Sequence, residues 1–93
     1  MAIQSSGEFE IITSTILMRV TQRLDAEPNN GPLINAKRGM EDAVAWVVQR
    51  KKLTALELKR FGDAAETVRQ VFRQDTALSD QLFDLLDFLE YRL

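Results

Sequence analysis

The clearest structural signal in the sequence is LTALELKRFGDAA, residues 53–65. Thr54 and Glu57 have the spacing of a capping box, in which each side chain accepts a hydrogen bond from the backbone amide of the other residue. Leu53 precedes this box and Leu58 follows it, which matches the hydrophobic staple that often accompanies such a cap. The stretch therefore predicts that a helix begins at Thr54.

On both sides of this start, apolar residues recur every three or four positions, which is the spacing of one buried helix face. In a predicted helix over 54–74 they are Leu58, Phe61, Ala64, Ala65, Val68, Val71 and Phe72, and over 33–51 they are Leu33, Ala36, Met40, Ala43, Val44 and Val47. Gly39 and Ala43 are small enough to let another helix approach closely. The short connection predicts that the two helices form an antiparallel or steeply crossed hairpin.

Two further helices flank this hairpin. Proline, asparagine and glycine dominate the segment 25–32, which separates it from a predicted helix over 7–24, capped by Ser5 or Ser6. The buried face of that helix consists of Phe9, Ile12, Ile16, Val20 and Leu24. A last helix over 79–92, capped by Thr76 or Ser79, buries Leu78, Leu82, Leu85, Leu86, Leu89 and Leu93, and leaves an acidic strip of Asp80, Asp84, Asp87 and Glu90.

These four amphipathic segments predict an all-α fold, a small helical bundle that forms a single domain over residues 1–93. Ninety-three residues support one hydrophobic core with little stability to spare. The alternative architecture is an extended hairpin whose core is completed in an oligomer. The loop over 25–32 permits the first helix to pack on its own chain or to be exchanged with a neighbouring copy.

The composition argues against catalysis. The chain has no Cys and no His, so it lacks the usual thiolate nucleophile, general base and metal ligands. It also has no glycine-rich phosphate loop, and we therefore expect no enzyme activity, no metal site and no cofactor. With no disulfides, no signal peptide and no long apolar stretch, we expect a cytoplasmic protein without a membrane partner.

Charge is distributed unevenly along the chain, although the net charge is only −2. Residues 33–60 carry seven basic and three acidic side chains, a balance of +4. Residues 79–93 carry one basic and four acidic side chains, a balance of −3. Such an asymmetry can orient subunits head to tail or steer a charged partner.

One function consistent with the basic middle segment is nucleic-acid binding through a helix-turn-helix-like pair of helices. The contacts would come from Arg50, Lys51, Lys52, Lys59 and Arg60. Glu57, Asp63 and Glu66 lie on the same predicted helix and would repel phosphates, and the chain is acidic overall. We therefore keep this function as the alternative.

The favoured function follows from surplus apolar residues. After each helix has buried one face, several large side chains are left over: Ile11, Met18, Trp46, Val48, Leu56, Phe83, Phe88 and Tyr91. A surface patch built from such residues marks an interaction site, and aromatic anchors dominate the energetics of interfaces. The sequence therefore predicts a non-enzymatic protein–protein interaction module, such as an assembly subunit, adaptor, chaperone or inhibitor, whose partner is another protein or a second copy in a homo-oligomer.

Overall fold

The computed structural model describes residues 3–93, which form four helices. Each helix begins after a side chain that accepts a hydrogen bond from a backbone amide of its first turn. The helices are α1 (Ser6–Ala26), α2 (Gly31–Val48), α3 (Ala55–Val71) and α4 (Thr76–Tyr91). The four N-caps are Ser5, Asn30, Thr54 and Asp75, with oxygen-to-amide distances of 3.0–3.2 Å. The predicted all-α class is confirmed.

Several predicted helix boundaries were wrong by up to one turn. α2 begins at Gly31 rather than residue 33, because Asn30 caps it and Pro32 is accommodated in the first turn. α4 begins at Thr76 rather than residue 79, because the cap is the Asp75 side chain. α2 and α3 each end three residues early, at Val48 and Val71, where the backbone turns toward the next helix.

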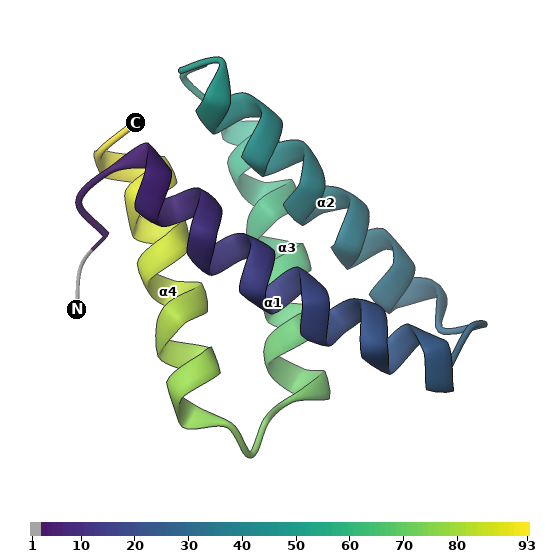
Figure 1. Cartoon of the computed structure of the whole chain (residues 1–93). Coiled ribbons are helices and arrows are strands. Elements are labelled where there is room, and N and C mark those ends of the chain that lie inside the picture. The colour runs from purple at the N-terminus through teal and green to yellow at the C-terminus, as the bar shows by residue number, and fades with distance from the viewer. Residues whose placement is uncertain (1–2) are drawn as a thin grey trace.

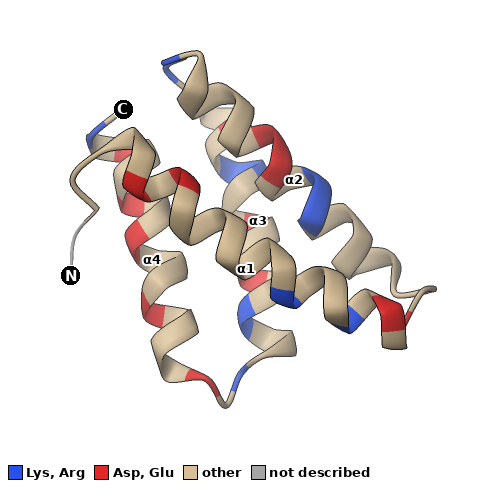
Figure 2. Cartoon of the chain, viewed as in Figure 1, with Lys and Arg blue, Asp and Glu red and all other residues tan. Residues whose placement is uncertain are grey.

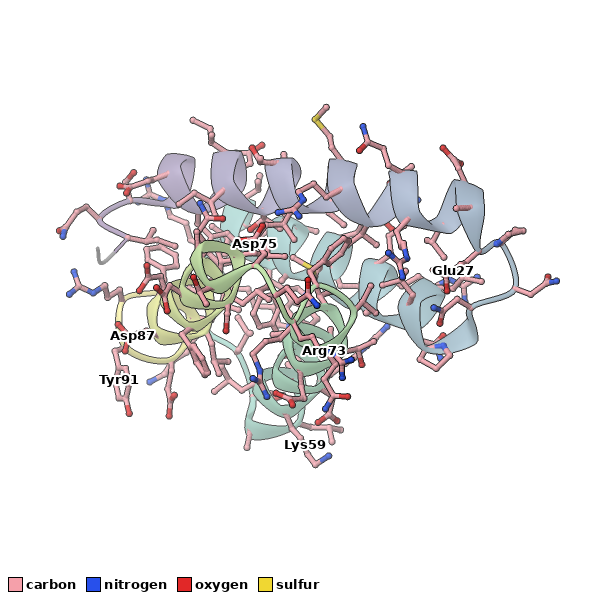
Figure 3. The ribbon with its side chains drawn as sticks, turned by 90° about the horizontal axis from the view of Figure 1, so that it is seen from below. Glu27, Lys59, Arg73, Asp75, Asp87 and Tyr91 are labelled. Atoms are coloured by element: carbon pink, nitrogen blue, oxygen red, sulfur yellow. The ribbon has the colours of Figure 1, made fainter. Side chains whose placement is uncertain are left out.

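Helices that follow one another in the chain pack together, and α4 closes the ring against α1. Seen in Figure 1, α1 runs in front of α3, while Figure 3 places α1 on one side of the bundle and α3 on the other. α2 and α4 flank them. The bundle therefore closes within one chain, with α1 packed against α2 and α4 of the same copy.

Three phenylalanine rings join α1, α3 and α4 at the centre of the core. The ring centroid of Phe9 lies 5.3 Å from that of Phe88 and 6.3 Å from that of Phe61, both in tilted arrangements. Phe88 is 4% exposed. The prediction that Phe88 lies on a partner interface was therefore wrong, because its position on α4 faces Phe9 and not solvent.

α2 and α3 come closest where small residues face each other. A Cβ atom added to Gly39 of α2 would lie 3.1 Å from the Cβ of Ala64 on α3, which is tighter than ordinary packing. Ala36 and Ala43 continue the small, buried face of α2 on either side. The close approach that Gly39 and Ala43 predicted is thus present, and Ala64 is its partner.

α1 is also tied to the turn between α3 and α4. Arg19 donates to the Asp75 carboxylate at 2.6 Å, and its guanidinium lies 4.8 Å from the centroid of the Phe72 ring. Asp75 caps α4 and Phe72 ends α3, so the ion pair joins α1 to α4 and the ring contact joins α1 to α3. The pKa of Asp75 is lowered by the Leu78 backbone amide and by Arg19.

Ile3 and Thr13 are buried, although neither belongs to a predicted helix face. Ile3, before α1, is 1% exposed and joins the core. Thr13 of α1 is fully buried, and its hydroxyl oxygen has no hydrogen-bond partner among residues 3–93. Ile3 precedes the helix, so periodicity does not place it. Thr13 lies four residues after Phe9 and three before Ile16, so helical spacing places it on the buried face, but a search for apolar residues passes over it. Within residues 3–93, every helix is too short or too polar to cross a membrane.

The Gly39 contact yields a direct prediction. Gly39→Val should lower the free energy of unfolding by about 1–3 kcal/mol, because the new side chain pushes α2 away from Ala64. Gly62→Val is the matched control, because an added Cβ there meets nothing within 4 Å and Val differs from Gly in helix propensity by less than about 0.5 kcal/mol. Urea unfolding followed by circular dichroism measures both, and equal effects would contradict the close packing of α2 on α3.

Candidate functional site

The turn between α2 and α3 is held in a defined geometry. The Lys51 amide donates to the Trp46 carbonyl at 2.9 Å, and the Arg50 amide donates to the Val47 carbonyl at 3.0 Å. These two bonds form a Schellman motif, with Arg50 at the left-handed position (φ 54°) that glycine usually occupies. The Lys51 ammonium lies 5.8 Å from the centroid of the Trp46 ring, where such motifs usually have an apolar contact.

The same turn is joined to α3 through Glu57. The predicted capping box is confirmed: Thr54 and Glu57 each accept a hydrogen bond from the amide of the other. Lys51 donates to Glu57 at 2.7 Å. The pKa of Glu57 is lowered by the Lys51 hydrogen bond and by the Thr54 amide, so the carboxylate stays charged to a lower pH than an ordinary glutamate does.

A groove of about 920 Å³ lies between α2 and α3. On its α2 side it is lined by Gly31, Pro32, Asn35, Ala36, Arg38 and Trp46, and on its α3 side by Leu56, Glu57, Lys59, Arg60, Asp63, Ala64 and Thr67. Leu56 is 77% exposed and Trp46 is half-buried at the turn end of the groove. The predicted interface residues Trp46 and Leu56 are therefore brought together on one surface.

The outer face of α4 carries a different surface. Phe83 and Tyr91 are 59% and 74% exposed, and they are eight residues apart on this helix. Asp80, Asp87 and Glu90 are exposed beside them. Figure 2 shows acidic positions recurring along α4, and Figure 3 shows the Asp87 and Tyr91 side chains pointing away from the other helices. Phe83 and Tyr91 therefore share an acidic, partly aromatic face.

Three other predicted interface residues lie elsewhere. Ile11 and Met18 are 70% and 65% exposed and are two turns apart on the outer face of α1. Val48 is 61% exposed at the end of α2, on the opposite side of that helix from Trp46. The structure therefore distributes the predicted residues over the α2–α3 groove, the α4 face and the α1 face, and places Phe88 in the core.

Most of the predicted nucleic-acid contacts are engaged with carboxylates. Lys59 pairs with Asp63 at 3.0 Å, Arg60 with Asp42 at 3.0 Å, and Lys51 with Glu57. Among residues 3–93, Arg50 and Lys52 form no ion pair, and both lie in the α2–α3 turn. Acidic and basic groups thus alternate along α3 rather than forming one basic surface.

No group of three or more acidic side chains in residues 3–93 is arranged to hold a metal ion. Glu66 pairs with Arg69 at 2.6 Å, and its pKa is lowered by that hydrogen bond and by Gln70. The shifted carboxylates, Glu57, Glu66 and Asp75, lie at helix ends or on exposed helix faces. Glu57 and Glu66 act within or next to α3, whereas Asp75 caps α4 and pairs with Arg19 of α1.

Sequence reasoning missed Arg38 and the residues that surround it in the groove. Arg38 is exposed, lines the groove and forms no ion pair within the part of the chain that the structure describes. A signal was present, because Gly39 marks the close approach of α3. Arg38 directly precedes Gly39, so it lies at the edge of the contact between α2 and α3 and faces the groove.

Comparison of the chain with models of protein families, with curated proteins and with solved structures finds no match.

The capping network predicts a pH dependence of stability. The folded-state pKa of Glu57 lies below its ordinary value of 4.5, so its contribution is present above that value and is lost as the pH falls through the folded-state pKa. Glu57→Gln should therefore lose less stability between pH 5 and about pH 3 than the wild type does. Urea midpoints measured at each pH test this.

Lys51→Gln is the second variant, because it leaves Glu57 titratable and removes the largest cause of its pKa shift. It should flatten the same pH dependence in part, since the Thr54 amide remains. A Glu57→Gln profile parallel to that of the wild type would contradict the network.

Proposed function

We propose that this chain is a non-enzymatic interaction module that binds another protein or a second copy of itself through exposed faces of its helices. The proposal rests on the observation that several large apolar side chains remain exposed to solvent in the folded chain. Those at 59–77% exposure are Ile11, Met18, Val48, Leu56, Phe83 and Tyr91. Burying such side chains contributes roughly 1.5–3 kcal/mol each for aliphatic residues and phenylalanine, and only a partner can bury them here.

The placement of these side chains supports the proposal further. On α1 and on α4 they are separated by seven and eight residues, so each pair lies on one helix face. Leu56 lies with the half-buried Trp46 at one end of a groove between two helices. Grooves and helix faces of this kind are the surfaces that amphipathic helices recognise.

Nucleic-acid binding remains the alternative prediction. Its support is limited to Arg50 and Lys52 in the turn, because Lys51, Lys59 and Arg60 already pair with carboxylates on the same surface. An incoming phosphate would have to displace Asp42, Glu57 and Asp63 or lie beside them, which opposes binding electrostatically.

The test replaces exposed apolar residues on all three surfaces in one variant: Ile11→Gln, Met18→Gln, Leu56→Gln and Phe83→Gln. Glutamine is a good helix former, and each change lies on the surface, so each should alter the free energy of unfolding by about 0.5 kcal/mol or less. The wild type should self-associate in light scattering, or retain a defined protein when immobilised and exposed to an extract of its own cells. The variant should do neither.

Phe88→Ala is the control for a core position, and it should lower the free energy of unfolding by roughly 3–5 kcal/mol. If the fourfold variant unfolds as readily as this control, the exposed residues support the fold and the proposal fails. It also fails if the wild type remains a monomer and retains nothing. Retention that nuclease treatment abolishes would favour the alternative.

A further inference from the structure

The outer face of α4 has the pattern of a helix that binds in a groove. Asp80, Phe83, Asp87 and Tyr91 are separated by three, four and four residues, so they form one stripe along the helix. All four are exposed, as is Glu90 beside them. Within residues 3–93, Asp80, Asp87 and Glu90 form no ion pair. The stripe therefore presents two aromatic side chains and three carboxylates to solvent.

The α2–α3 groove of the same molecule has complementary chemistry. It contains Arg38, and its turn end adjoins Arg50 and Lys52; none of the three pairs with a carboxylate of residues 3–93. Lys59 and Arg60 also line the groove, but their pairs with Asp63 and Asp42 balance their charges. The basic groups available to a partner are therefore Arg38, Arg50 and Lys52. Basic groups therefore lie beside the apolar surface of the groove.

The dimensions of the two surfaces also agree. The groove follows α2 from Pro32 to Trp46, which spans about 21 Å at 1.5 Å per residue. The stripe from Asp80 to Tyr91 spans about 16 Å on the same scale. The whole stripe therefore fits within the length of the groove.

We propose that the α4 stripe of one copy, Asp80, Phe83, Asp87, Glu90 and Tyr91, docks in the α2–α3 groove of a second copy. The aromatic side chains contact the apolar part of the groove near Trp46 and Leu56, and the carboxylates face Arg38, Arg50 and Lys52. This deepens the proposed function, on which it rests, by naming the partner and both surfaces.

The two surfaces belong to different helices, and Figure 3 shows Asp87 and Tyr91 pointing away from the bundle at α4. One copy therefore cannot fill its own groove with its own α4 stripe. Because each copy offers one stripe and one groove, the contact is heterologous and repeats from copy to copy into a ring or an open chain. Opposite charges across the contact make the association sensitive to salt.

Two variants test the α4 stripe and the α2–α3 groove independently. The stripe variant carries Phe83→Gln and Asp87→Lys, and the groove variant carries Arg38→Glu and Leu56→Gln. All four residues are exposed, so both variants should retain the fold, as circular dichroism and urea unfolding can verify. The wild type should show a mass that rises above 10.6 kDa with concentration at low salt and falls toward it at high salt.

Each variant alone should stay at the monomer mass, with self-affinity weakened at least about tenfold. Mixed one to one, they should form a dimer and nothing larger, because one intact stripe meets one intact groove. A variant with Ile11→Gln and Met18→Gln on the α1 face is the matched control and should associate like the wild type.

A mixture that stays monomeric overturns the docking, as does a wild type that stays monomeric at every concentration. If the α1 control abolishes association while the stripe and groove variants retain it, self-association proceeds through α1. The docking is then wrong while the proposed function stands. A wild type that is monomeric and also retains no protein from its own cells contradicts both.

Discussion

Where α2 meets α3, a glycine faces an alanine, and the rest of the structure depends on this close contact. The absence of a side chain at Gly39 lets Ala64 approach until an added Cβ would be 3.1 Å away. The Schellman turn and the capping box fix the connection between the same two helices, with Lys51 and Glu57 joined across it. α1 and α4 then close the core against this pair, with Phe9 of α1 packed against both Phe61 of α3 and Phe88 of α4.

The same constraint shapes the surface. Small residues on α2 and α3 bring the two backbones together and leave a groove above them, lined at its turn end by Trp46 and Leu56. Because α4 buries most of its leucines and Phe88 in the core, its other face is left with carboxylates, Phe83 and Tyr91. Figure 2 shows the result as an acidic helix on one side and basic positions on α2 and its turn. The proposed association uses what the packing of the core leaves exposed.

Local and periodic signals predicted most of the fold. The Thr54–Glu57 box depends on neighbours in sequence, and it is confirmed. The N-caps Asn30 and Asp75 were missed, because Pro32 and Thr76 nearby are also plausible helix starts. The sequence alone does not show which of these residues begins the helix, since this depends on the backbone conformation of the folded chain. Phe88 was misplaced because its position at the edge of the apolar face of α4 does not reveal that Phe9 lies opposite. Arg38 was missed because a groove arises from two helices, and periodicity describes one at a time.

Hydrogen exchange of the backbone amides, measured at two protein concentrations tenfold or more apart, tests most directly whether one chain completes this core around the α2–α3 contact. The account predicts the slowest exchange in α2 and α3 near Gly39 and Ala64, with the same protection at both concentrations. It also predicts that protection gained at the higher concentration is confined to the surfaces of α2, α3 and α4. Slow exchange in α2 and α3 that appears only at the higher concentration would contradict the account, because the core would then be completed by a second copy.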